Sequence, residues 1–188
     1  MISKQNNEPI RIDEGPARTN IVLIGMPGVG KSTLGVVLAK MTGMDFLDVD
    51  LVIQKREGKT LQALIDENGA AGFIALENEV LCDIAVADTV IATGGSAVYS
   101  DEGLRRQNET GVVVYLQTSC ESLESHLGNF EQRGVVMRDE TVKNLRALYD
   151  ERVPLYERFA DITVDVEGLS ITNAVRQLAD AVQEYKRA

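Results

Sequence analysis

Several residue types are scarce in this chain of 188 residues, and each scarcity narrows what the protein can be. It has no tryptophan, one histidine and two cysteines, and 19 basic residues face 29 acidic ones, for a net charge of −10. We therefore expect no nucleic-acid partner, because a nucleic-acid surface needs a strong positive patch. Cys82 and Cys120 lie far apart without CxxC spacing, so we expect two ordinary reduced thiols.

Long hydrophobic runs are also missing. No stretch approaches the roughly 18 apolar residues that span a membrane, and the polar N-terminus lacks the apolar segment of a signal peptide. We expect a flexible extension over residues 1–18, one domain over residues 19–188, and a cytoplasmic monomer without a membrane partner. The length suits one domain with a real core and is short for two.

Five short apolar runs have the continuous hydrophobicity of strands that are covered on both faces. They comprise residues 21–24, 46–49, 90–92, 112–116 and 162–166. Amphipathic stretches with helical periodicity occupy residues 33–41, 61–67, 73–86, 145–159 and 171–185. This alternation predicts an α/β fold with a parallel sheet, whose ligands bind at the carboxyl ends of the strands.

Residues 128–140 fit neither pattern, because they combine two glycines, mixed charge and little periodicity. A surface loop is one interpretation. Arg133 and Arg138 favour a second, a mobile lid that closes over phosphates and excludes water.

One motif identifies a phosphate site. The first apolar run leads directly into Gly25-Met26-Pro27-Gly28-Val29-Gly30-Lys31-Ser32-Thr33, which matches G-x-x-x-x-G-K-[ST] and opens a predicted helix. Glycines let the backbone wrap around phosphate oxygens, and the helix start adds N–H donors and positive potential. We expect Lys31 to bridge the β- and γ-phosphates of ATP, and the Ser32 hydroxyl to bind Mg²⁺.

The motif occurs in several classes of protein. The chain is too short for most ATPase motors, and it lacks the Asn-Lys-x-Asp sequence of small GTPases. A small-molecule kinase is therefore the leading prediction.

Two carboxylates follow the second apolar run. Asp48 and Asp50 stand at i and i+2, so on a strand they would share one face. One could then meet a Mg²⁺-bound water and the other a substrate hydroxyl. The alternative is structural, with Asp50 capping a helix and Asp48 in solvent.

The sequence resembles the shikimate kinase family over about residues 20–167. Three further segments carry the likeness: Phe46-Leu47-Asp48-Val49-Asp50 with Gly58-Lys59-Thr60, the glycine-rich turn in Val90-Ile91-Ala92-Thr93-Gly94-Gly95-Ser96-Ala97-Val98, and Arg152-Val153-Pro154-Leu155-Tyr156. The resemblance implies a three-layer P-loop fold with a five-stranded parallel sheet of the nucleoside-monophosphate-kinase type and a lid.

The resemblance also implies roles for single residues. Asp48 would hold Mg²⁺ through water, and Asp50 would bind the acceptor hydroxyls and orient or deprotonate the attacking one. Arg133 would reach the transferring phosphate from the lid, and Arg152 would bind the acceptor carboxylate. Gly94, Gly95 and Ser96 would line the acceptor site.

The chain departs from the family pattern at four places. The family's Phe-Arg-x-x-Glu segment has Ile74 in place of the arginine that helps to bind the shikimate carboxylate, while Glu77, its usual partner, remains. Ser96 replaces a third turn glycine, and its hydroxyl could donate to the acceptor. Gly134 replaces a lid proline, and His126 stands where an arginine near the nucleotide is usual.

These departures leave three hypotheses open. The acceptor is shikimate, held by Arg152 with help from Arg133 or Arg138. Alternatively, it is a different small polyol or hydroxy acid, less anionic or larger. A catalytically impaired nucleotide-binding homologue is the third, although Lys31 and Asp48 argue against it. Gluconate and nucleotide kinases fit less well, because they do not explain Arg152 or the Asp48–Asp50 pair.

Overall fold

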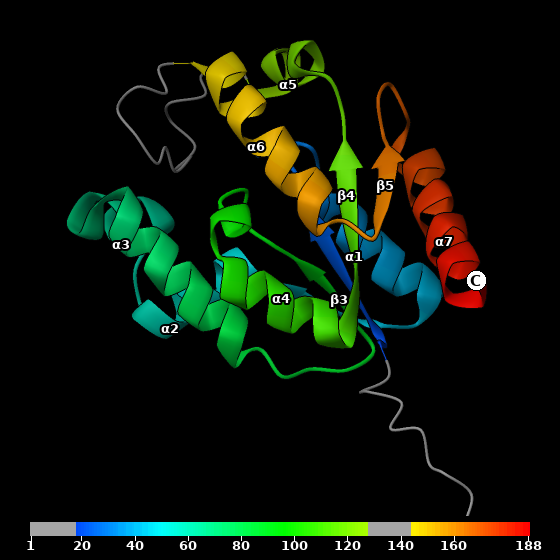
Figure 1. Ribbon diagram of the computed structural model, residues 1–188, viewed down its shortest axis with the longest axis horizontal. Helices are drawn as coiled ribbons and strands as arrows, with labels where there is room; N and C mark the ends of the chain where they lie inside the picture. The colour runs from blue at the N-terminus through cyan, green and yellow to red at the C-terminus, as the bar shows by residue number, and fades with distance from the viewer. Residues whose placement is uncertain (1–17, 128–143) are drawn as a thin grey trace, which may run out of the picture.

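The computed structural model describes residues 18–127 and 144–188, and its centre is a sheet of five parallel strands. The strands are β1 (Asn20–Ile24), β2 (Asp45–Asp48), β3 (Thr89–Ala92), β4 (Gly111–Gln117) and β5 (Ile162–Asp165). Their order is β2-β3-β1-β4-β5, with β1 in the middle (Figure 1). All four neighbouring pairs are parallel, which confirms the predicted fold class.

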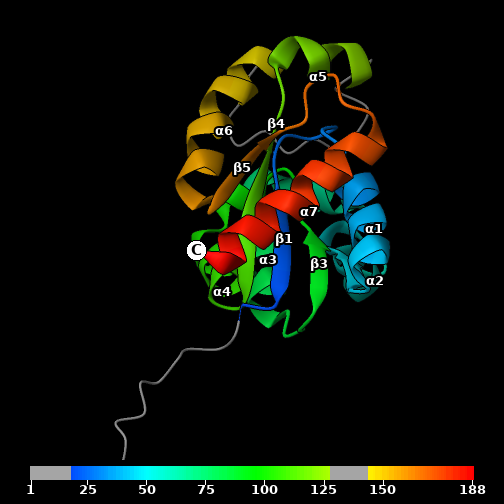
Figure 2. The same cartoon turned by 90° about the vertical axis from the view of Figure 1, so that its right-hand side faces the viewer.

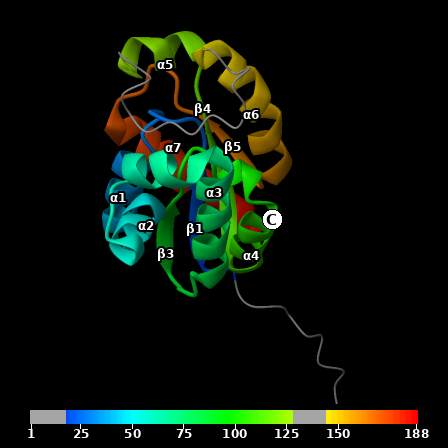
Figure 3. The same ribbon diagram turned by 90° about the vertical axis from the view of Figure 1, so that its left-hand side faces the viewer.

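Helices cover both faces of the sheet. Helices α1 (Lys31–Thr42) and α7 (Ile171–Arg187) cover one face (Figure 2). On the other face lie α3 (Leu61–Asp83), α4 (Asp101–Thr110) and α6 (Leu145–Phe159) (Figure 3). Successive residues of β1 serve the two cores in turn: Ile21 and Leu23 pack with Leu38 and Val175, and Val22 packs with Leu104 and Tyr156 on the opposite face. This two-sided burial explains the continuous apolar runs of the strands.

Three short helices complete the described fold, and none was predicted from the sequence. They are α2 (Val49–Glu57), the 3₁₀ helix η1 (Ala97–Tyr99) and α5 (Cys120–Leu127). Helix α4 was missed as well. Within α4 only Gly103, Leu104 and Gln107 are buried, so its apolar periodicity gives little signal. The helix predicted over residues 145–159 matches α6, and the other predicted elements in the described residues are present with shifted ends.

Two of those shifts bear on the site. Strand β2 ends at Asp48 instead of Val49, because the Asp48 side chain caps α2 by accepting hydrogen bonds from the backbone N–H groups of Asp50 and Leu51. The two predicted helices over residues 61–86 form one element, α3, interrupted at Gly69, whose φ of 68° is not helical.

The N-terminal boundary also differs from the prediction. Arg18 was assigned to the extension, but its guanidinium donates hydrogen bonds to the Gly111 carbonyl and pairs with Asp161. It therefore belongs to the folded domain. The rest of the predicted extension and the whole predicted lid, Arg133 and Arg138 included, lie outside the described residues. Within the described part of the chain, no helix is long and apolar enough to cross a membrane.

Candidate active site

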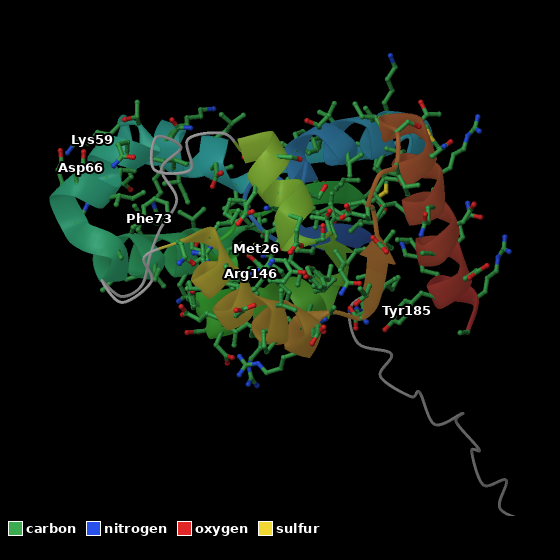
Figure 4. All side chains as sticks on the ribbon, turned by 90° about the horizontal axis from the view of Figure 1, so that it is seen from above. Met26, Lys59, Asp66, Phe73, Arg146 and Tyr185 are labelled. Atoms are coloured by element: carbon green, nitrogen blue, oxygen red, sulfur yellow. The ribbon has the colours of Figure 1, made fainter. Side chains whose placement is uncertain are left out.

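The carboxyl ends of β1, β2 and β3 bring three segments together. Strand register pairs Ala92 of β3 with both Leu23 of β1 and Asp48 of β2. The segments that follow these strands, residues 25–30, 48–50 and 93–96, therefore meet at one edge of the sheet. Figure 4 looks onto this edge from above, with Met26 near the middle of the molecule.

The first segment is the phosphate-binding loop. Its backbone depends on glycine: Gly25 has a φ of 148°, and a Cβ there would lie 2.8 Å from the Leu116 carbonyl oxygen. Gly30 caps α1 in the left-handed region with a φ of 100°, and it has no side chain to satisfy the first N–H groups of the helix. The loop thus leaves N–H donors and the positive end of the helix dipole directed at an anion.

Lys31 lies under this loop. It is buried, and its Nζ donates hydrogen bonds to the carbonyl oxygens of Gly25 (2.8 Å) and Met26 (3.0 Å). Burial lowers the pKa of Lys31 to about 8, against the opposing effect of the Asp50 carboxylate. A triphosphate in the loop would favour the charged ammonium, because the added negative charge opposes the cost of burial. Ser32 and Thr33 are exposed at the start of the same helix.

A cavity of about 350 Å³ adjoins the loop. Gly28, Val29 and Gly30 line one side of it, and Leu169 and Ile171 before and at the start of α7 line another. Its mixed apolar and polar walls suit a nucleobase. This pocket was not predicted from the sequence, because its lining residues come from distant parts of the chain. The sequence shows only two large apolar residues, Leu169 and Ile171, at these positions. In the structure their side chains are 38% and 50% exposed, which is unusual for large apolar residues. The side chain of His126, the residue predicted near the nucleotide, lies outside the described part.

The two aspartates are arranged differently from the prediction. They do not share a strand face, because Asp48 ends β2 and Asp50 lies in the first turn of α2. Asp48 is the helix cap, the reverse of the structural alternative considered from the sequence. Asp50 is half-buried, and its pKa is raised by burial and by the Asp48 charge, with Lys31 opposing the shift. Both carboxylates still lie at the carboxyl edge of the sheet.

The turn after β3 separates two groups of side chains. A Cβ on Gly94 would lie 2.3 Å from Glu77 Oε1 and 3.0 Å from Asp50 Oδ1. A Cβ on Gly95 would lie 2.7 Å from the Pro27 ring and 3.1 Å from Arg152 Nη1. Only glycines allow the backbone of this turn to fit between two carboxylates on one side and an arginine on the other.

Arg152 is fully buried in α6, and two tyrosines position it. Its Nε donates to the Tyr99 hydroxyl (3.2 Å), and its guanidinium lies 5.1 Å from the centre of the Tyr99 ring. Tyr156 donates its hydroxyl proton to the Gly95 carbonyl (2.7 Å) and so ties α6 to the turn. Sequence reasoning named Arg152 but missed the role of both tyrosines, since only the fold brings Tyr99 to α6.

Ser96 and Glu77 form a buried pair that sequence reasoning also missed. The Ser96 hydroxyl, predicted to donate to the acceptor, donates instead to Glu77 Oε2 at 2.7 Å. Both residues are buried. The clue in the sequence was the combination of a lone Glu77 with a serine in a glycine turn, but nothing in the sequence places the two side chains together.

The site offers a small set of oxygens for Mg²⁺. Among the described residues, no three His, Cys, Asp or Glu side chains gather into a metal cluster. Magnesium in phosphoryl-transfer sites needs only one or two protein oxygens, with phosphates and waters supplying the rest. The exposed Ser32 hydroxyl and the Asp48 carboxylate meet that requirement.

A parallel sheet with β1 at its centre, a glycine loop that begins a helix and a buried lysine beneath it define the class of P-loop nucleotide-binding phosphotransferases. Comparison with known proteins narrows the class. The shikimate kinase family model matches residues 27–183. Shikimate kinases of Vibrio vulnificus and Vibrio parahaemolyticus are 36% and 37% identical over 168 residues, which is 89% of this chain and 98% of each relative.

Solved structures agree with this result. The shikimate kinase of Acinetobacter baumannii in complex with shikimate has a TM-score of 0.81 at 29% identity, covering 89% of this chain and 94% of that one. The enzyme from Aquifex aeolicus has a TM-score of 0.74 at 30% identity, covering 87% and 96%. The chain belongs to the shikimate kinase family, whose members are ATP-dependent phosphotransferases that act on a hydroxyl group.

Proposed function

We propose that this chain transfers the γ-phosphoryl group of ATP to a hydroxyl of shikimate. The observation that carries the proposal is that Asp50 and Arg152 lie on the two sides of the glycine turn at residues 94–95, and that both interact electrostatically with Lys31. Phosphoryl transfer requires positioning and neutralisation of negative charge more than covalent chemistry. These three side chains supply a cation for phosphate, a carboxylate for the acceptor hydroxyl and a cation for the acceptor carboxylate.

The nucleotide side depends on the loop. Its N–H groups and the start of α1 would hold the β- and γ-phosphates, and Lys31 would bridge them. Ser32 and Asp48 would hold Mg²⁺, Asp48 through water; when bound, the ion neutralises charge on the phosphate oxygens. Asp48 can do so while capping α2, because the N–H groups of Asp50 and Leu51 both donate to its Oδ1 atom.

On the acceptor side, Asp50 would orient the attacking hydroxyl and accept its proton as the bond to phosphorus forms. Its raised pKa suits a group that gains a proton during the reaction. Arg152 would bind the acceptor carboxylate, since Gly95 leaves the guanidinium close to the turn.

Arg133 remains a prediction as the lid cation, as do the Mg²⁺ requirement, the monomer, the single domain and the cytoplasmic location.

A second candidate is a related kinase that phosphorylates another small polyol or hydroxy acid. Ile74 favours it, because an apolar side chain replaces a guanidinium that would contribute roughly 1.5–3 kcal/mol to binding a carboxylate. Among the described residues, the charged side chains that act on Glu77 near the glycine turn are two cations, Lys31 and Arg152, and one further carboxylate, Asp50. The acceptor site therefore has little surplus positive charge for an anionic acceptor.

Turnover of ATP with a panel of acceptors tests both candidates. The panel contains shikimate, quinate, gluconate and a neutral cyclic polyol, each with ATP and Mg²⁺, and the product is identified by the mass of one added phosphoryl group. We expect shikimate to have the highest kcat/KM. If another acceptor exceeds it, the second candidate replaces the first. If no acceptor stimulates ATP turnover, the chain is an impaired homologue.

A further inference from the structure

Glu77 is a buried carboxylate that the proposed mechanism does not use. It lies on α3 with none of its surface exposed, and the Ser96 hydroxyl satisfies one of its oxygens, Oε2. Within residues 18–127 and 144–188, the other oxygen, Oε1, is buried without a hydrogen-bond partner. An unsatisfied buried carboxylate oxygen is costly to a fold, so its presence requires a reason.

The surroundings of Glu77 do not supply a structural reason. Ile74 lies one turn earlier at i−3, on the same side of α3, but its side chain has no hydrogen-bond donor. The charged and titratable groups that act on Glu77 come from α1, α2 and α6. Lys31 and Arg152 attract the Glu77 carboxylate, and Asp50 repels it. Tyr156 also interacts with it electrostatically. Burial outweighs the two cations and raises the pKa of Glu77 to about 7.

The direction of Oε1 indicates what it does. It lies against the Gly94 side of the turn, the side that also faces Asp50 Oδ1, whereas Arg152 lies against the Gly95 side. Glu77 is thus next to the carboxylate proposed to orient the acceptor hydroxyl. It lies across the turn from the guanidinium proposed to bind the acceptor carboxylate.

We propose that Glu77 is a specificity-determining residue of the acceptor site: its Oε1 hydrogen-bonds directly with a ring hydroxyl of the acceptor, adjacent to the hydroxyl that Asp50 orients, while Ser96 holds Oε2. This inference rests on the proposed function, because it takes the acceptor to be a ring with vicinal hydroxyl groups. Ser96 fixes the rotation of the carboxyl group, and Gly94 leaves room for Oε1 beside the turn.

The proposal makes different predictions for acceptor binding and for the stability of the fold when Glu77 is replaced. A side chain kept for folding should destabilise the protein when it is replaced. A carboxylate kept for the acceptor, at a cost in burial, should instead weaken acceptor binding when it is replaced, while a neutral variant of the same shape leaves the protein at least as stable. Two variants of the same size distinguish these roles: Glu77→Gln keeps a hydrogen-bonding group, and Glu77→Met removes it.

The experiment measures KM and kcat for shikimate, and for analogues that each lack one ring hydroxyl, in the wild type and both variants. Calorimetric titration of the wild type with shikimate in the presence of ADP and Mg²⁺ comes first. Glu79→Gln is the matched control, because Glu79 lies two residues away on α3 with an exposed side chain. Thermal melting of each variant verifies the fold.

We expect Glu77→Met to raise KM for shikimate about tenfold or more, the loss of one hydrogen bond to a carboxyl group, with KM for ATP unchanged. Glu77→Gln should have a KM for shikimate close to that of the wild type, because the amide keeps a hydrogen-bonding group. For the analogue without the contacted hydroxyl, the wild type and Glu77→Met should have the same KM.

The proposal is overturned if Glu77→Met leaves KM for shikimate unchanged, or raises it equally for every analogue. Should Glu77→Met fail to fold, Glu77→Ala, which also lacks a hydrogen-bonding group, replaces it in the analogue series: equal effects on all analogues count against a direct contact. If the wild type neither binds nor phosphorylates shikimate, the proposed function itself has failed, a result that the wild-type titration reveals before any variant is examined.

Discussion

The nucleotide half and the acceptor half of the site are built in different ways. The phosphate-binding part of the nucleotide half is one continuous segment, residues 25–33, where the backbone shape and Lys31 form the site. The proposed acceptor half combines side chains of four segments: Asp50 on α2, Glu77 on α3, Ser96 after β3 and Arg152 on α6. A local segment can be conserved as a unit, whereas a site assembled from distant side chains can change one residue at a time, as Ile74 shows.

Removing the lysine of the nucleotide half should have the largest effect. Lys31→Ala is expected to lower kcat by about 10²–10³, because it removes a preorganised cation from the transferring phosphate. Steady-state turnover of ATP with shikimate measures the loss. Lys40→Ala, an exposed lysine at the end of the same helix, is the control. Near-normal turnover by Lys31→Ala would contradict the assignment of the phosphate site.

Changing the buried arginine of the acceptor half should affect only the acceptor. We expect Arg152→Lys to raise KM for shikimate about tenfold to a hundredfold, because lysine cannot reproduce a bidentate contact with a carboxylate. KM for ATP should change little, and this difference distinguishes binding from general damage. Arg158→Lys is the control, an exposed arginine on the same helix. Equal increases in both KM values would show that Arg152 supports the fold instead.

Restoring the missing arginine tests whether the acceptor half retains the family's geometry. Ile74→Arg should lower KM for shikimate by about tenfold, because it adds a second guanidinium for the carboxylate. Ala75→Arg adds the same charge at the next position, where the side chain is exposed, and should have little effect. An unchanged KM in Ile74→Arg would indicate an acceptor other than shikimate.

The smallest expected effect is a pH dependence of stability. The pKa of Glu77 is raised from 4.5 to about 7, so the folded state holds this proton more tightly than the unfolded state. The resulting stability is fully present below about pH 4.5 and is lost as the pH rises through about 7. Glu77→Gln should therefore melt about 7–13 °C above the wild type at pH 8, and much closer to it at pH 5.

Melting curves of both proteins between pH 5 and pH 8 measure this difference. Glu79→Gln should follow the wild type at every pH, because Glu79 is exposed. A constant gap between Glu77→Gln and the wild type would show that the Glu77 carboxyl does not titrate in this range.

The predictability of the site follows the same division. The loop at residues 25–33 could be read from the sequence because its function depends on neighbouring residues. The role of Asp48 as a helix cap could not be predicted from the sequence. Strand β2 ends at Asp48 and α2 begins at the next residue, so in the sequence the two elements form one apolar run with two carboxylates. Helix α4 was not predicted, because its few buried residues form no apolar stripe in the sequence.

The sequence by itself determined the parallel α/β fold, the phosphate loop and the family, because these depend on periodic burial and on motifs whose residues are close along the chain. Only the tertiary structure decided that the Ser96 hydroxyl serves Glu77, that two tyrosines hold Arg152, and that Gly94 and Gly95 separate two carboxylates from a guanidinium. Each of these contacts joins residues far apart in sequence. Their distances are set by the packing of helices on the sheet, which a local pattern does not encode.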